Sequence, residues 1–128
     1  MKTRILVVDD DKSIADSLCT ILKSAGYQAI SRYSGEDALA AFNVFQPDVV
    51  IADVVMPGMS GIELCTQLRD RCHTSMVLLS GNVMTEELLN EGRTKLRDDI
   101  VVLAKPYPPR DLIRLIQEIT SAGLKNVS

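Results

Sequence analysis

Five short apolar runs, each followed by a stretch with helical spacing, place the strongest constraint on the fold of this chain. Most of the runs are rich in β-branched residues and lack polar alternation, which is typical of strands buried on both faces of a sheet. The runs cover residues 4–8, 27–31, 48–52, 76–79 and 100–104. Strands that alternate with helices favour a parallel sheet with helices on both faces. The pattern predicts an α/β protein with a doubly wound, five-stranded parallel sheet.

Five helices are predicted from caps, breakers and the 3.6-residue recurrence of apolar side chains. The first two cover about residues 11–26 and 34–47, and the third starts at residue 60. The last two cover about residues 85–96 and 109–120. Asp11 can cap the first helix, and Ser60 with Glu63 forms a capping box at the third. Gly92 weakens the fourth helix.

The 128 residues are enough for one domain with a substantial core. We expect residues 1–121 to form this domain and residues 122–128 to form a polar C-terminal tail. A net charge of −3 and the lack of a long Lys/Arg block argue against direct nucleic acid binding. No stretch approaches the length of a membrane span, and the apolar run after Met1 is too short for a signal peptide.

The cysteines are few, odd in number and widely spaced. Cys19, Cys65 and Cys72 form no CxxC pair, which is typical of free thiols in a reducing cytosol. His73 is the only histidine, so a zinc site is a poor interpretation. We therefore expect a cytoplasmic protein without structural disulfides.

Polar residues follow the apolar runs at the points where the strands stop. Asp9 and Asp10 follow the first run, and Asp53 follows the third. Ser80 and Lys105 follow the fourth and the fifth. Because ligands of open α/β sheets bind beyond the carboxyl ends of the strands, these side chains are expected to converge there.

Three converging carboxylates repel one another unless a cation lies among them or a proton is bound. Oxygen ligands without His or Cys point to Mg²⁺, with Mn²⁺ as the alternative. A cation, a lysine and a hydroxyl around a carboxylate suit phosphoryl transfer, in which charge spreads over the phosphoryl oxygens. One acid would then be the nucleophile and form an aspartyl phosphate.

In this order and spacing the residues resemble the receiver domain of two-component response regulators. The resemblance rests on Asp9-Asp10, residues 53–61 (DVVMPGMSG), Ser80 and Lys105-Pro106, and covers nearly the whole chain. It implies a flavodoxin-like fold with strand order 2-1-3-4-5, and a signalling switch rather than a turnover enzyme.

The resemblance also implies a role for each residue of the site. Asp53 would accept a phosphoryl group from a sensor histidine kinase or phosphotransfer protein. Asp10, Asp53 and the backbone carbonyl of Val55 would bind the metal directly, and Asp9 would assist through a water. The phosphoryl oxygens would be bound by Lys105, the Ser80 hydroxyl and the Gly81 amide. The Lys105–Pro106 bond is expected to be cis.

Activation is expected to change partner binding or oligomeric state, including a homodimer, through the fourth helix, the fifth strand and the last helix. Three features depart from the family pattern. Val102 occupies the place of a switch aromatic, the segment from Ser80 to Lys105 is a few residues longer than usual, and Leu96-Arg-Asp-Asp99 replaces a usual Gly-Ala. These features affect the output face and not the phosphorylation chemistry.

Val55, two residues after Asp53, cannot hydrogen-bond a hydrolytic water with its side chain. This predicts a long-lived aspartyl phosphate.

Other functions fit the sequence less well. A Mg²⁺-dependent phosphatase generally carries a second acid two residues after its nucleophile, where this chain has Val55. A flavin carrier needs a glycine- and hydroxyl-rich phosphate loop after the first strand, and Asp9-Asp10-Asp11 would repel a phosphate. A receiver used only for docking would not need the intact acids. The sequence is compatible with a stand-alone receiver and with one domain of a longer regulator.

Overall fold

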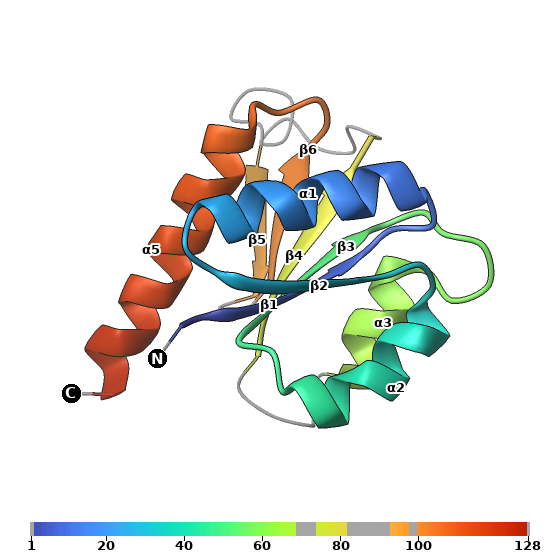
Figure 1. Ribbon diagram of the computed structural model, residues 1–128, viewed down its shortest axis with the longest axis horizontal. Coiled ribbons are helices and arrows are strands. Elements are labelled where there is room, and N and C mark those ends of the chain that lie inside the picture. The colour runs from blue at the N-terminus through green and yellow to red at the C-terminus, as the bar shows by residue number, and fades with distance from the viewer. Residues whose placement is uncertain (1, 69–73, 82–92, 98–99, 128) are drawn as a thin grey trace.

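The computed structural model describes residues 2–68, 74–81, 93–97 and 100–127. In chain order the elements are β1 (Arg4–Val8), α1 (Lys12–Ser24), β2 (Gln28–Arg32), α2 (Gly35–Phe45), β3 (Val49–Asp53), α3 (Gly61–Leu68), β4 (Ser75–Ser80), β5 (Arg93–Arg97), β6 (Ile100–Ala104) and α5 (Pro109–Val127). Figure 1 shows a twisted central sheet with helices packed against it.

The sheet has the order β2-β1-β3-β4-β6-β5. The first five strands of this order pair in parallel, which confirms the predicted sheet and its order. The predicted strands lie within one residue of those observed at each end. Asp53 and Ser80 are the last residues of β3 and β4.

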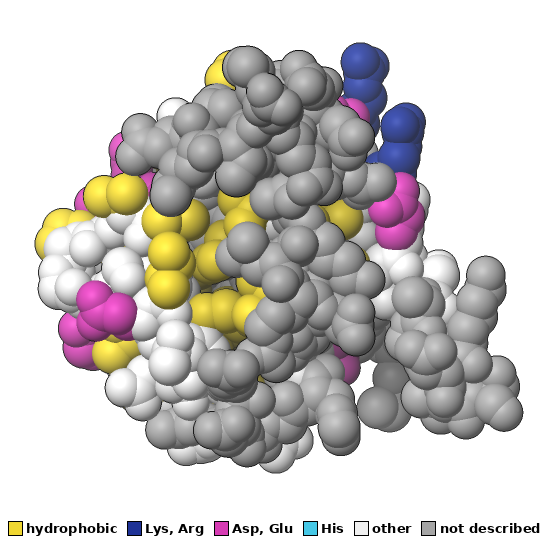
Figure 2. Space-filling model, turned by 180° about the vertical axis from the view of Figure 1, so that it is seen from behind, with side chains coloured by type: hydrophobic (Ala, Val, Ile, Leu, Met, Phe, Trp, Pro, Cys, Tyr) yellow, Lys and Arg dark blue, Asp and Glu magenta, His cyan; other side chains and the backbone are white. Residues whose placement is uncertain are grey.

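Alternate residues of the buried strands face opposite layers of helices, as strand geometry requires. Ile5, Val7 and Ile51 pack with α1 and α5, whereas Leu6 and Val50 pack with α2 and α3. Both faces are therefore apolar, which explains the unbroken apolar runs. On the side opposite Figure 1, hydrophobic side chains are visible near the centre of the surface (Figure 2).

The helix predicted over residues 85–96 is wrong for residues 93–96, which belong to β5; residues 85–92 lie outside the described ranges. β5 pairs with β6 in the antiparallel direction, so the sheet gains an edge strand. Only residues 98 and 99 separate β5 from β6, a connection short enough for a hairpin. Four helices are present in the described part of the chain.

The last helix continues beyond its predicted end near Thr120 and reaches Val127. Ala122, Leu124 and Lys125 are strong helix formers, and no proline interrupts the segment. These preferences favour continuation of the helix, which extends through Gly123 despite its cost of about 1 kcal/mol relative to alanine. The helix therefore includes most of the segment that we expected to be a tail.

Asp11 and Ser60 cap their helices as predicted, and Ser34 caps α2. The side chains of Asp11 and Ser34 accept hydrogen bonds from the amides of Ile14 (3.3 Å) and Asp37 (3.1 Å). Ser60 Oγ accepts from the amide of Glu63 at 3.1 Å. The Glu63 carboxylate contacts the Ser60 hydroxyl, not the Ser60 backbone amide expected for a capping box. No helix in the described ranges has the length and apolar content needed to cross a membrane.

Replacement of Leu22 by alanine tests the packing of α1 on the sheet. Leu22 is fully buried in the core shared by α1 and α5. We expect Leu22→Ala to lower the free energy of unfolding by about 2–5 kcal/mol, because it leaves a cavity. Val44→Ala, at an 88% exposed position of α2, is the matched control and should change it by less than about 0.5 kcal/mol. Urea denaturation measures the free energy of unfolding of both variants. An equal loss in the two would contradict the placement of Leu22 in this core.

Candidate functional site

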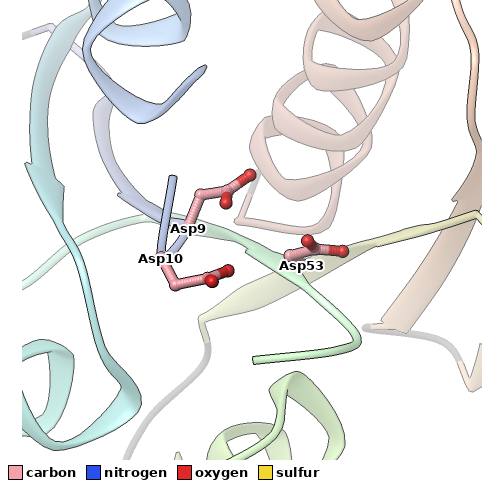
Figure 3. A group of neighbouring side chains, drawn as sticks. All are labelled: Asp9, Asp10 and Asp53. Carbon is pink, nitrogen blue, oxygen red and sulfur yellow. The ribbon is translucent and has the colours of Figure 1, made fainter. Parts of the chain in front are cut away.

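The carboxyl ends of β1 and β3 bring three aspartates together. Asp9 and Asp10 follow β1 directly, and Asp53 ends β3, its parallel neighbour. One carboxylate oxygen from each lies within 4.8 Å of the others, and Figure 3 shows the side chains grouped at this edge. The predicted convergence of the three acids is therefore present.

Asp9 is the most buried member of the cluster, with 2% of its surface exposed. Its Oδ1 accepts a hydrogen bond from the Asp11 amide at 2.9 Å, whereas its buried Oδ2 has no hydrogen-bond partner among the described residues. Burial raises the pKa of Asp9, and the charges of Asp53 and Asp10 raise it further. The Asp11 amide and Lys105 lower this pKa but do not cancel the effect of burial.

Lys105 supplies positive charge at the end of β6. Its Nζ lies 3.2 Å from Asp53 Oδ2, and the two side chains are 30% and 16% exposed. Its backbone amide donates to the Ser80 carbonyl at 2.8 Å, which fixes the chain where β4 and β6 end together. The Lys105–Pro106 bond is cis.

Ser80 and Gly81 lie at the end of β4, next to the Lys105 backbone. Ser80 is 6% exposed and pairs with Ala104 of β6. Gly81 is exposed, and a Cβ added to it would meet no atom within 4 Å. Both residues therefore lie at the same edge of the sheet as the acids.

The loop after β3 returns closely to the site. The Val54 amide donates to the Leu79 carbonyl, and the Gly61 amide donates to the Val54 carbonyl, each at 3.0 Å. A Cβ on Gly61 would overlap the Asp53 carbonyl oxygen, so only glycine fits there without movement. The Val55 side chain points into solvent and is 68% exposed.

Sequence reasoning did not single out Tyr107, two residues after Lys105. Burial raises the pKa of Tyr107 to about 12, with further contributions from the charges of Asp9 and Asp53. Its side chain packs against the core shared by α1 and α5. Proximity to Lys105-Pro106 was the only sequence signal that could have identified it.

The arrangement suits a small, hard cation. Three carboxylates lie close together with one lysine ammonium among the described groups. A divalent cation would relieve their repulsion, and the unpartnered Asp9 Oδ2 is an oxygen available to it or to its bound water. The donor set therefore fits Mg²⁺ and offers neither the thiol nor the imidazole that zinc prefers.

The cysteines and methionines in the described ranges add no ligand to this cluster. Cys19 and Cys65 are buried free thiols. Met56 is buried in the core shared by α2 and α3, and Met59 packs against that core. Cys72 and His73 lie outside the described residues.

Comparison with known proteins gives a consistent result. Residues 5–117 match the family model described as the response regulator receiver domain. The DNA-binding response regulator MtrA of Mycolicibacterium smegmatis is 35% identical over 117 residues, which are 91% of this chain and 50% of that protein. The sensory transduction protein RegX3 of the same organism is 34% identical over 124 residues, 97% of this chain and 53% of that protein. The chain thus spans about half the length of these relatives.

Solved structures resemble nearly the whole chain. A CheY-like response regulator receiver domain protein from Methanospirillum hungatei superposes with a TM-score of 0.82 at 29% identity, covering 98% of this chain and 99% of that one. The chemotaxis protein CheY4 of Vibrio cholerae gives a TM-score of 0.78 at 30% identity, covering 93% and 99%.

The raised pKa of Asp9 predicts how an isosteric amide changes stability. A carboxyl group that binds its proton more tightly in the folded state stabilises the fold below its ordinary pKa of 3.8. This contribution is lost as pH rises through the raised pKa. At neutral pH and without metal, we expect Asp9→Asn to have a higher free energy of unfolding than the wild type. The difference should shrink as the pH falls toward 3.8, the ordinary pKa of the carboxyl group.

Urea denaturation between neutral pH and the ordinary pKa of 3.8 measures the difference in free energy of unfolding between Asp9→Asn and the wild type. Asparagine keeps the oxygen that accepts from the Asp11 amide, so the comparison isolates the charge. Saturating Mg²⁺ should narrow or reverse the difference, because ligand binding stabilises the folded wild type. A difference that does not vary with pH would contradict the prediction.

Proposed function

The chain belongs to the response regulator receiver domains of two-component signalling, and from this premise we propose that Asp53 accepts a phosphoryl group in the presence of Mg²⁺. The observation that carries the proposal is the cluster of Asp9, Asp10 and Asp53, whose oxygens lie within 4.8 Å of one another, with Lys105 3.2 Å from Asp53. This arrangement combines a nucleophile, acids for a cation and a positive charge beside the attacking group.

Asp53 is the best nucleophile of the three acids. Its Oδ2 is paired with Lys105 and its side chain remains 16% exposed, so a phosphoryl donor can approach it. Asp9 is almost fully buried, with one oxygen engaged by the Asp11 amide. Asp10 is exposed, which suits a ligand that shares its metal with water.

The proposed reaction is transfer from a phosphohistidine. A carboxylate oxygen of Asp53 attacks phosphorus as the phosphorus–nitrogen bond to the donor imidazole breaks, and that nitrogen keeps the bonding electron pair. Lys105 pairs with a phosphoryl oxygen, while the Ser80 hydroxyl and the Gly81 amide donate to the others. The product is an aspartyl phosphate on this chain and a dephosphorylated donor.

Asp10, Asp53 and the Val55 carbonyl are proposed to hold Mg²⁺, with Asp9 acting through a water; Mn²⁺ fits the same oxygen donors. The bound ion supplies charge neutralisation for the phosphoryl oxygens. The unpartnered buried Oδ2 of Asp9 supports this assignment, because a hydrated cation would satisfy it.

Receiver domains act as signalling switches, and we propose that this chain is one and not a turnover enzyme. A phosphatase with an aspartyl nucleophile would use an acid two residues later, where the apolar Val55 is 68% exposed. The proposed phosphodonors are a sensor histidine kinase or a phosphotransfer protein. A cytoplasmic location fits the free thiols of Cys19 and Cys65.

We propose that the output surface includes β6 and α5, where phosphorylation would alter partner binding or a homodimer. Val102, in place of an aromatic, is 6% exposed and pairs with Leu78 and Thr94. Such a valine cannot rotate between inward and outward positions as an aromatic side chain does. The step that passes phosphorylation on to the output surface must therefore differ in this chain. The net charge of −3 does not favour direct nucleic acid binding by this chain.

The phosphorylation site can be tested with a small-molecule phosphodonor. We expect acetyl phosphate with Mg²⁺ to add one phosphoryl group to the wild type, detected by intact mass, and none to Asp53→Asn. Asp48→Asn is the matched control, because Asp48 precedes β3 and its carboxylate accepts from the Arg4 amide at the other end of the sheet. Phosphorylation of Asp53→Asn to the wild-type extent would refute the proposal.

The lifetime of the phosphoryl group provides a second test. The Val55 side chain offers no group that could hydrogen-bond a hydrolytic water, so we expect slow autodephosphorylation in the wild type. Val55→Asn supplies such a group and should hydrolyse several-fold faster, whereas Val44→Asn, at an exposed position of α2, should not. Loss of phosphoprotein over time measures the rate, and an equal or slower rate for Val55→Asn would contradict the prediction.

A further inference from the structure

The loop between β3 and α3, residues 54–60, is attached to the first turn of α2 by a contact that the phosphorylation chemistry does not itself use. The Met59 amide donates a hydrogen bond to Glu36 Oε1 at 3.3 Å. Glu36 lies 23 positions away in sequence and is exposed, outside the acidic cluster. The contact joins the helix after β2 to the loop that carries Val55.

The two ends of this loop are held near the site by other interactions. At its start, the Val54 amide donates to the Leu79 carbonyl, and Met56 is 6% exposed in the core. At its end, the Gly61 amide donates to the Val54 carbonyl. The turn at Gly58 and Met59 lies between these anchors, so its conformation depends on what it contacts.

The turn fits closely against α2. Gly58 has a φ of +73°, and a Cβ added there would lie 3.2 Å from Glu36 Oε1. A Cβ on Gly35 would lie 2.8 Å from Met59 Cβ. Only glycine at both positions allows this approach without movement, which brings the Glu36 carboxylate to the Met59 amide.

We propose that Glu36 is a positioning residue for the phosphorylation site. By holding the turn at Gly58 and Met59, it favours the loop conformation that presents the Val55 carbonyl to the divalent cation. The inference rests on the proposed function, because it assumes that this carbonyl is a metal ligand. A carboxylate acceptor holds the Met59 amide more firmly than a neutral one, since hydrogen bonds to carboxylates are stronger than those between neutral groups.

Glu36 also lies in the first turn of α2, where any acid favours the helix dipole. Asp37 separates the two effects. It is exposed and acidic in the same turn, and its carboxylate makes no hydrogen bond to the loop among the described residues. Asp37→Ala therefore removes the same charge from the helix and leaves the loop contact in place.

The test compares Glu36→Ala, Glu36→Gln and Asp37→Ala with the wild type. In metal-free protein, hydrogen exchange of the Met59 amide followed by NMR should accelerate about fivefold in Glu36→Ala, as expected for loss of one hydrogen bond. The Mg²⁺ dissociation constant, from calorimetry, should rise by up to the same factor, because a smaller fraction of the loop is competent to bind. Glu36→Gln keeps a neutral acceptor and should lie between the wild type and Glu36→Ala.

Asp37→Ala should match the wild type in both measurements, and urea denaturation shows whether overall stability has changed. Equal effects of Glu36→Ala and Asp37→Ala would overturn the inference, as would wild-type Mg²⁺ affinity in Glu36→Ala. Failure of the proposed function is distinguishable: the wild type itself would then bind no Mg²⁺, while Met59 exchange would still report on the contact.

Discussion

Burial of the Asp9 carboxylate beside Asp10 and Asp53 costs free energy that the rest of the fold must offset. Like charges repel at this distance, and one oxygen of Asp9 has no hydrogen-bond partner among the described residues. The parallel sheet makes the arrangement possible, because β1 and β3 end side by side between two apolar layers. The local destabilisation leaves a site that would gain from binding a cation, which would link stability and metal affinity through the same three carboxylates.

The elements nearest the site were the most predictable from sequence. Unbroken apolar runs identify strands buried on both faces, and the position where each run stops places Asp9, Asp53 and Ser80 at one edge. This inference needs only strand periodicity and the geometry of parallel sheets. The roles given to these residues rest on the family resemblance and remain predictions.

The features that sequence reasoning missed depend on contacts between distant segments or on weak local preferences. The segment Arg93–Arg97 has no strong helix or strand pattern, and its pairing with β6 determines its structure. The end of α5 depends on helix propensities that differ by about 1 kcal/mol per residue or less. The Glu36–Met59 contact joins residues 23 positions apart, and nothing in either local sequence indicates it.

The antiparallel strand β5 also changes how the sheet meets its surroundings. An outermost strand has backbone groups without a strand partner on one side, and these can pair with the strand of another molecule. Three of the five residues in β5 are basic, so two copies brought edge to edge would place like charges together. Extension of the sheet from molecule to molecule is thus disfavoured at this edge.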